Sequence, residues 1–219
     1  MAEKNQISEE NWKKIKNELE KLKKGPIDVL KLPEDSKKIG SIDNSPGIYK
    51  WWAKESAVET ILEELDLEIN FDKIRLYLEY DQKNDLYCIY VGQAGNASSN
   101  SLRSRLKKHM SPNLYNSTFR QTIGCLIKEV RKAEKCINKL IADYIKNFKI
   151  TYYPINEEKL KVLKSLNENK DVSITDIEEK IINDSLHILN IQDNDYKKYN
   201  NSSKIKEKLK DLRKEKEKY

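Results

Sequence analysis

Residues that hold metals through sulfur or imidazole are scarce in this 219-residue chain, which has three cysteines and two histidines. Cys88, Cys125 and Cys136 are widely spaced, and the chain contains no C-x-x-C pair. We therefore expect neither a disulfide framework nor a zinc site.

Long apolar stretches are missing as well. No stretch approaches the roughly 20 apolar residues that a membrane-spanning helix needs. The first residues, Met-Ala-Glu-Lys-Asn-Gln, contain no apolar core of a signal peptide. We expect a cytoplasmic protein with no membrane partner. No internal repeat, zinc finger or convincing helix-turn-helix is recognisable, which favours a compact protein over one with a remote DNA-binding module.

Charge is what the chain has in abundance: 36% of its residues are charged and its net charge is +6. Between residues 100 and 139, ten lysines and arginines face only two glutamates, so this segment carries eight net positive charges. Such a block indicates a polyanionic partner, and a solvated helix face is the alternative. The residues expected to bind nucleic acid are Arg103, Lys107, Lys108, Arg120, Lys128 and Arg131.

Hydrophobic periodicity and turn residues predict a mixture of helices and strands. The predicted helices span residues 8–24, 55–65, 101–110, 174–186 and 203–219, with one or two basic helices over 117–148 that break near Lys132. The predicted strands span residues 47–53, 74–80, 86–91 and 149–155, with a hairpin turn at 81–85 and loops at 27–46 and 92–100. Pro154 indicates that the last strand is an edge strand or ends there. These elements predict an α+β fold with a small, mostly antiparallel central sheet flanked by helices.

Five features with chemical potential follow one another in a fixed order. They are Gly47-Ile48-Tyr49, Tyr90-Val91-Gly92, Arg105 with His109 on one helical face, Glu178, and Asn190 twelve residues later. In this order they resemble the GIY-YIG nuclease family, which is named after two short strands that end in such tripeptides.

Two further segments carry the same resemblance. The segment Tyr90-Val-Gly-Gln-Ala-Gly, followed by a helix with Arg105, is similar to the family's Y-[IV]-G-K-A and L-x-x-R-[LV] pattern. Glu178-Glu-Lys-Ile-Ile is similar to the family's E-x-x-L-I, whose glutamate binds the metal. Gln93 departs from the pattern because it stands at the usual lysine, and Lys50 or Lys54 are candidate substitutes for that charge.

The resemblance covers roughly residues 46–190 and implies a domain organisation. Residues 1–45 would form an N-terminal helix and linker, and residues 46–194 a GIY-YIG nuclease domain with insertions at about 54–85 and 111–172. Residues 195–219 would form a charged C-terminal helix or tail.

The resemblance also implies a metal-dependent endonuclease that hydrolyses phosphodiester bonds in double-stranded DNA. Glu178 would hold one Mg²⁺ or Mn²⁺, and Arg105 would donate to a non-bridging phosphate oxygen. Tyr49 and Tyr90 would orient or deprotonate the attacking water, with His109 as a proton partner. Asn190 would position a catalytic side chain or the substrate. Cutting both strands with one site would require a dimer or two successive nicks.

Structural alternatives stand beside each of these roles. Tyrosines are common on strands, and Arg105 and His109 could belong to an ordinary solvated helix face. Thr175-Asp-Ile-Glu178 fits a capping box, in which the glutamate closes on the helix start. Glu134 is an alternative metal ligand. Competing functions are a non-catalytic nucleic-acid-binding module that kept the fold, and an interaction protein that uses its charged terminal helices.

Overall fold

The computed structural model describes residues 7–29, 40, 42–95, 100–111, 117–127, 137–168, 171–190, 199 and 201–216. The predictions made for Lys128, Arg131, Lys132 and Glu134 lie outside these residues.

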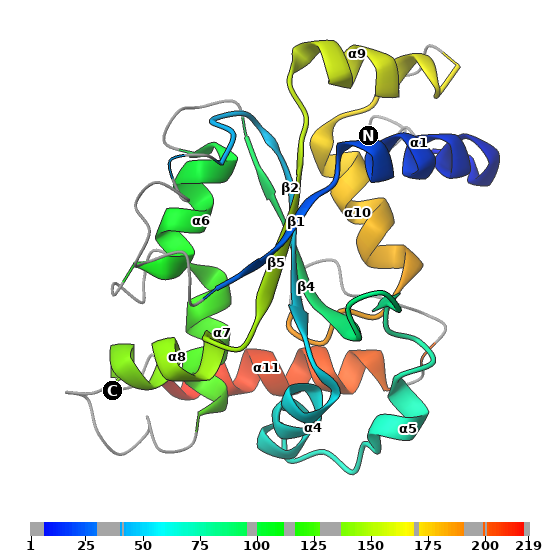
Figure 1. Ribbon diagram of the computed structural model, residues 1–219. Helices are drawn as coiled ribbons and strands as arrows, with labels where there is room; N and C mark the ends of the chain where they lie inside the picture. The colour runs from blue at the N-terminus through cyan, green and yellow to red at the C-terminus, as the bar shows by residue number, and fades with distance from the viewer. Residues whose placement is uncertain are drawn as a thin grey trace.

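Helices and strands are mixed along the described chain, and the predicted α+β fold is confirmed (Figure 1). The strands are β1 (Lys24–Asp28), β2 (Gly47–Ala53), β3 (Tyr80–Asp81), β4 (Leu86–Ala94) and β5 (Lys149–Pro154). The helices are α1 (Glu9–Leu22), α4 (Glu55–Glu64), α5 (Phe71–Ile74), α6 (Leu102–Met110), α7 (Thr118–Leu126), α8 (Ile137–Ile145), α9 (Glu157–Ser165), α10 (Ile174–Asp184) and α11 (Ser202–Lys216).

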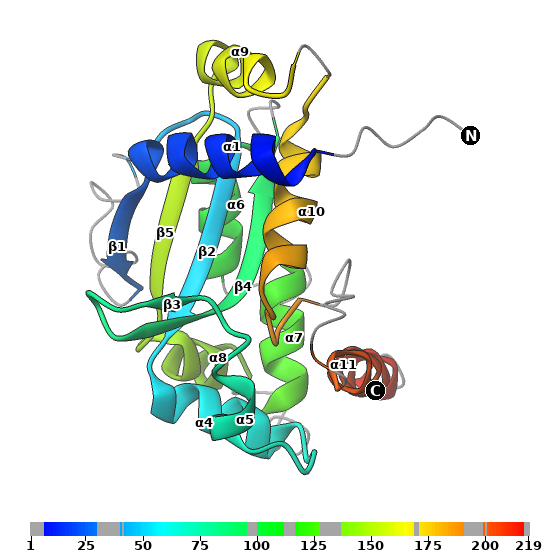
Figure 2. The same ribbon diagram turned by 90° about the vertical axis from the view of Figure 1, so that its right-hand side faces the viewer.

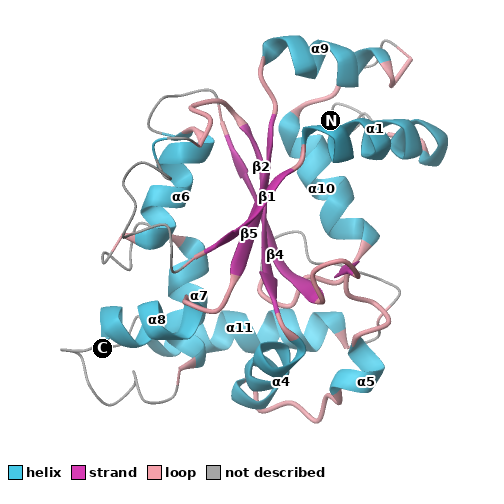
Figure 3. Ribbon diagram, viewed as in Figure 1, coloured by secondary structure: helices cyan, strands magenta, loops and turns pink. Residues whose placement is uncertain are grey.

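One five-stranded sheet in the order β1-β5-β2-β4-β3 forms the centre, and all its strand pairs are antiparallel. In Figure 2 strands β1, β5, β2 and β4 lie side by side, with α1 in front of them and α6 behind. Helices flank the sheet on both sides, as Figure 3 shows. No helix in the described part of the chain is long and apolar enough to be a membrane span.

Two hydrophobic clusters lie on opposite faces of the sheet. One holds Tyr49 and Trp51 of β2 together with residues of α4, α6, α7, α8 and α11. The other holds Ile48 and Trp52 with residues of α1, α9 and α10. Because side chains alternate along a strand, neighbouring residues of β2 contribute to different clusters. Both faces of β2 are therefore buried.

Two strand predictions near the sheet edges were wrong. Of the predicted strand 74–80 only Tyr80 is in a strand, since Asn70 caps a short helix whose Ile74 and the following Leu78 are buried at helical spacing. Residues 24–28 form a strand although we expected a helix end and a loop, because they pair with β5. As a result β5 lies inside the sheet, and Pro154 marks its end rather than an edge.

Candidate functional site

A bulge in β4 turns Tyr90 toward Tyr49. Trp51 pairs with Tyr90 but the next residue, Trp52, pairs with Cys88, so Ile89 is an extra residue in β4. In a regular strand Tyr90 would share the face of Cys88, two positions away. The extra residue places Tyr90 in the same cluster as Tyr49 and Trp51 instead. The two phenol rings lie 6.4 Å apart between centroids.

Gly92 gives the phenol of Tyr49 its space. A Cβ atom at Gly92 would lie 2.4 Å from Tyr49 Oη and 2.5 Å from its Cζ, closer than van der Waals contact permits. Gly92, the last residue of Tyr90-Val91-Gly92, must therefore be a glycine, because the ring of Tyr49 occupies the space that a side chain would need.

Replacing Gly92 with alanine should consequently push the Tyr49 ring out of place. We expect the Gly92→Ala variant to lose about 1–3 kcal/mol of unfolding free energy, as for overpacked cores. Urea unfolding measures this loss. Gly40→Ala is the matched control, since nothing lies within 4 Å of a Cβ there, and equal behaviour of the two variants would contradict the account.

His109 joins Tyr49 to the start of α7. Its Nε2 lies 2.8 Å from Tyr49 Oη, and its Nδ1 lies 2.6 Å from Oγ of Ser117. Ser117 is the N-cap of α7, where its Oγ accepts the N–H of Arg120. Burial, followed by the charges of Arg105 and Arg120, lowers the pKa of His109 to about 3. The imidazole is therefore neutral at pH 7, with one nitrogen donating and the other accepting.

Arg120, which we predicted to bind nucleic acid, is buried, and this position does not suit contact with a phosphate. The side chain is only 1% exposed, and its Nη1 donates to the backbone carbonyl of His109 at 3.2 Å. The sequence shows the charge of this residue but not its burial. Arg120 instead ties the end of α6 to α7 and so supports the position of His109.

Arg105 and Glu178 act electrostatically on both phenols. Burial raises the pKa of Tyr49 well above its usual value; the charge of Glu178 raises it further, whereas Arg105 lowers it through charge and hydrogen bonding. Burial also raises the pKa of Tyr90, again with a raising effect from Glu178 and a lowering effect from Arg105. The Nε of Arg105 is buried and has no hydrogen-bond partner within the described ranges. This donor is suited to an anionic oxygen.

The alternative explanation for Glu178 as part of a capping box is wrong. The capping box of α10 is formed by Ser173 and Asp176, two residues earlier than the expected Thr175 and Glu178. Thr175 instead donates to Oε1 of Gln93 at 3.1 Å and ties α10 to β4. Glu178 is half-buried on a helix that packs against β4, the strand that carries Tyr90.

Asn190 holds the backbone directly after Tyr90. Its Nδ2 donates to the carbonyl of Val91 at 2.8 Å, and its Oδ1 accepts the N–H of Val91 at 2.9 Å. One position earlier, Leu189 N donates to the carbonyl of Ile89 at 2.9 Å. The segment after α10 thus binds β4 on both sides of Tyr90, at the bulge. This geometry suits a positioning role better than a contact with substrate.

The sequence analysis missed Arg213 of α11. Its Nη2 donates to the carbonyl of Thr118 at 2.7 Å and to Oγ1 of Thr122, both on α7, and its charge lowers the pKa of Tyr90. We interpreted residues 195–219 as an extension, yet α11 buries Ile205, Leu209 and Leu212 in the cluster that contains Tyr49. The spacing of these three residues is that of an amphipathic helix, and it was the available signal.

The remaining basic residues of α6 lie near its surface to different degrees. Lys107 is exposed, whereas Arg103 and Lys108 are half-buried. Arg103 donates from Nε to the backbone carbonyl of Ile42 at 2.8 Å. Lys107 is thus the most accessible of the three for a phosphate.

A second cluster of potential metal ligands lies on the opposite face of the sheet. Within the described residues, ligand atoms of Glu79, Cys88 and His187 lie within 4.8 Å of one another. However, Nζ of Lys50 lies 2.7 Å from both carboxylate oxygens of Glu79. The carboxylate is thus already neutralised, and a thiol is a poor ligand for Mg²⁺. We had suggested that Lys50 could supply the charge of the family lysine that is Gln93 here. Because Lys50 lies on the opposite face from Tyr49 and pairs with Glu79, it cannot do so.

The groups around Tyr49 and Tyr90 fit a hard divalent cation better than this cluster does. Glu178 offers carboxylate oxygens, and the neighbouring groups are phenols and the guanidinium of Arg105, which can bind a phosphate oxygen beside a cation. The carboxylate also lies close enough for its charge to act on both phenols. One carboxylate with water completing the shell is a common arrangement for Mg²⁺.

Both histidines of the chain make its stability sensitive to mild acid. Burial lowers the pKa of His109 to about 3 and also lowers the pKa of His187, so the unfolded chain takes up protons first as pH falls. Their contribution to stability is complete above about pH 6.5 and is lost progressively below it. His109 alone should cost about 1.4 kcal/mol per pH unit between pH 6 and pH 5, and His187 adds to this loss in the same direction.

Urea unfolding at pH 7, 6 and 5 measures this slope directly. His109→Gln keeps a polar side chain without the titration, and we expect it to lower the slope by about 1.4 kcal/mol per pH unit. An unchanged slope in this variant would contradict the assignment of a neutral, buried His109.

Comparison with protein families identifies a match to the GIY-YIG catalytic domain over residues 47–215. The match includes both tyrosine-bearing strands, α6, α10 and nearly all of α11. Comparison with curated proteins and with solved structures gives no match.

Proposed function

Because this chain belongs to the GIY-YIG catalytic domain family, we propose that it is a metal-dependent endonuclease that hydrolyses phosphodiester bonds in double-stranded DNA. The observation that carries the proposal is the meeting of Tyr49, Tyr90 and His109, which come from two strands and a helix. The opposite charges of Arg105 and Glu178 act on the same two phenols. A protein that only binds nucleic acid would not need two phenols, an imidazole and these two charged groups to meet at one place.

In this proposal the phenols orient and deprotonate the attacking water. The raised pKa keeps the Tyr49 phenol protonated, so it can accept a proton from water only while it passes its own proton on. Neutral His109 offers an acceptor, since its Nε2 lies 2.8 Å from Tyr49 Oη. Ser117, at Nδ1, fixes the ring orientation. His109 would hold the proton only briefly, because its pKa is low.

The phosphate would be held by positive charge. Arg105 would donate from its buried Nε to a non-bridging oxygen. Glu178 would hold Mg²⁺ or Mn²⁺, which when bound neutralises charge that develops on the phosphoryl oxygens. Arg103, Lys107 and Lys108 of α6 would contact neighbouring phosphates, and so would Lys128 and Arg131. Asn190 would keep Tyr90 in place. We also propose that the nuclease domain includes α11.

Supercoiled plasmid DNA tests the proposal. With Mg²⁺ or Mn²⁺ we expect conversion to nicked and linear forms. With EDTA we expect none, because without a cation at Glu178 the charge that develops on the phosphoryl oxygens is not neutralised. Circular dichroism in EDTA should remain that of the folded protein, since both hydrophobic clusters are packed from apolar and aromatic side chains. DNA binding without cleavage under either cation would favour a non-catalytic binding protein instead.

A further inference from the structure

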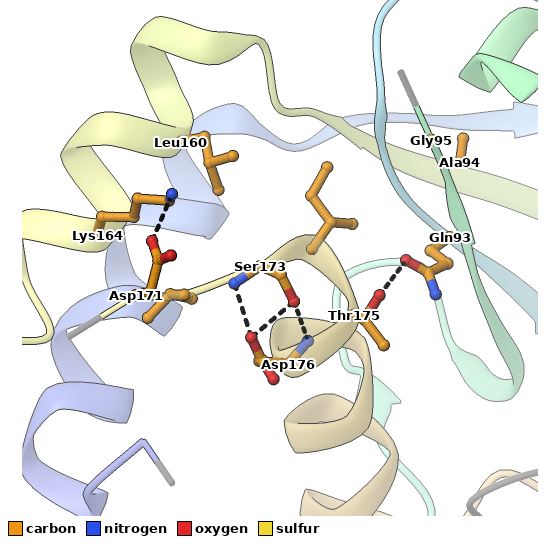
Figure 4. Close-up of a pocket in the computed structure, with 11 residues that line it drawn as sticks. Gln93, Ala94, Gly95, Leu160, Lys164, Asp171, Ser173, Thr175 and Asp176 are labelled. Atoms are coloured by element: carbon orange, nitrogen blue, oxygen red, sulfur yellow. Dashed lines mark hydrogen bonds and ion pairs between the residues drawn. The ribbon is translucent and has the colours of Figure 1, made fainter. Parts of the chain in front are cut away.

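A cavity of about 470 Å³ opens between the end of β4, the start of α10 and α9 (Figure 4). Gln93 and Ala94 line it from β4, Leu160 from α9, and Thr175 from α10. Neither phenol of the candidate active site lines this cavity. Its size is within the range of small-ligand sites.

The cavity shares two elements with the proposed catalytic groups. Gln93 follows Tyr90 by three positions on β4, and Thr175 precedes Glu178 by one turn of α10, about 4.5 Å along the helix axis. The hydroxyl of Thr175 donates to Oε1 of Gln93 at 3.1 Å, and this contact forms one rim of the cavity. Gln93 faces the other side of the sheet from Tyr90, but three strand positions span only about 10 Å, so a nucleotide next to the scissile phosphate can reach the cavity around the end of β4.

The lining favours a neutral, flat group over a phosphate. Leu160 and Ile174, which are both half-buried, supply apolar surface. Of the charged groups, the carboxylate of Asp171 pairs with Lys164 at 2.6 Å, and no cation among the lining residues pairs with the carboxylate of Asp176. The lining thus carries one net negative charge, which repels an anion.

The polar atoms at the rim match the edge of a nucleobase. An amide such as Gln93 can pair with a base edge, and a hydroxyl such as Thr175 can accept or donate beside it. A base ring placed against Leu160 and Ile174 would meet apolar surface on its face. A base within a duplex stack cannot enter an enclosed site, and extrusion costs least for an unpaired or mismatched nucleotide.

We propose that this cavity binds a nucleobase extruded from the DNA next to the scissile phosphate, and that Gln93 and Thr175 select the base. The preferred substrate is then a duplex with an unpaired or mismatched nucleotide beside the cut. This inference deepens the proposed nuclease function and rests on it.

Cleavage kinetics of duplexes with a single bulged nucleotide test the inference. Removing the bulged base to leave an abasic site should lower kcat/KM for the wild type about tenfold. The same removal should matter less than twofold for the double variant Gln93→Ala/Thr175→Val, which has already lost the contacts. Gln82→Ala is a matched control, because Gln82 is an exposed amide in the turn at the other end of β4. Equal sensitivity of the wild type and the double variant to base removal would overturn the inference.

A binding measurement separates this inference from the proposed function. A duplex with a bulged 2-aminopurine, mixed with protein in Ca²⁺, should show a change in fluorescence on binding that the double variant abolishes and the control keeps. If the wild type cleaves no DNA with any cation, the proposed function fails, and this fluorescence alone decides whether the cavity binds a base. Identical fluorescence changes in the wild type and the double variant would exclude the cavity as a base site.

Discussion

Replacing Glu178 with alanine is expected to reduce DNA cleavage about a thousandfold while DNA binding persists. The carboxylate is the group best suited to hold the cation on the Tyr49 face, and loss of electrostatic stabilisation of a transition state commonly costs 10² to 10³ in kcat. DNA affinity should stay the same or rise slightly, because the variant removes a negative charge near the phosphate. Single-turnover cleavage at saturating Mn²⁺, together with fluorescence anisotropy of labelled duplex in Ca²⁺, measures both quantities.

Glu179→Ala is the matched control for this variant. Glu179 is also a half-buried glutamate on α10, so both substitutions make the same change in charge and helix propensity. We expect Glu179→Ala to cleave within about threefold of the wild type, as for a surface substitution outside the reacting groups. If the two variants cleave equally well, Glu178 is not the metal ligand.

Removing one partner of the buried Lys50–Glu79 pair is expected to lower the unfolding free energy by about 3–5 kcal/mol. Lys50 is 5% exposed and has both oxygens of Glu79 at 2.7 Å. In Glu79→Ala the ammonium would remain buried without its carboxylate, and that desolvated charge is the source of the loss. Replacing both residues, as in Lys50→Met/Glu79→Leu, should recover most of the stability. Urea unfolding at pH 7 of the three proteins gives these values.

The pH dependence of this pair has a defined sign. Burial raises the pKa of the Glu79 carboxyl, but the charge of Lys50 outweighs burial and holds this pKa well below its usual range. The stabilisation is therefore complete above about pH 4.5 and is lost as the pH falls below that value.

Glu10→Ala is the control for Glu79→Ala, because Glu10 pairs with Lys14 on the exposed surface of α1. Its replacement should lower the unfolding free energy by less than about 1 kcal/mol. A loss in Glu79→Ala no larger than in Glu10→Ala would contradict a buried ion pair.

The central strands and the helices beside the site were predictable because their residue types and hydrophobic spacing are those of strands and helices. Gly47–Ala53 is aromatic and follows a proline, and it forms β2. Leu102 and Leu106 of α6 stand one turn apart and are both buried. The fold class followed from such segments, and it is confirmed.

What could not be predicted depends on contacts between distant segments. The bulge at Ile89 aims Tyr90 at Tyr49, yet nothing in the local sequence distinguishes it from a regular strand. Strand β1 exists because β5 lies beside it, and its Gly25-Pro26 sequence is typical of a helix end. Two capping patterns two residues apart precede α10, and only the structure shows that Ser173 and Asp176 form the box.

Charge gave incomplete information about the site for a similar reason. Arg120 and Lys107 both belong to the basic block, but one is buried under His109 and the other is exposed. Arg213 lies more than a hundred residues from Arg105 in sequence, and the packing of α11 on α7 brings its charge to Tyr90. Sequence reports which charges exist, whereas the fold decides which of them meet.

The position of a bound cation tests the central claim most directly. Crystals of the protein with a short DNA duplex and Mn²⁺, measured for anomalous scattering at the manganese edge, would locate the ion without reference to activity. We expect one Mn²⁺ at the carboxylate of Glu178, on the side of Tyr90, with a phosphate oxygen of the DNA between the ion and Arg105. Manganese at Glu79, Cys88 and His187 with none at Glu178 would contradict the account.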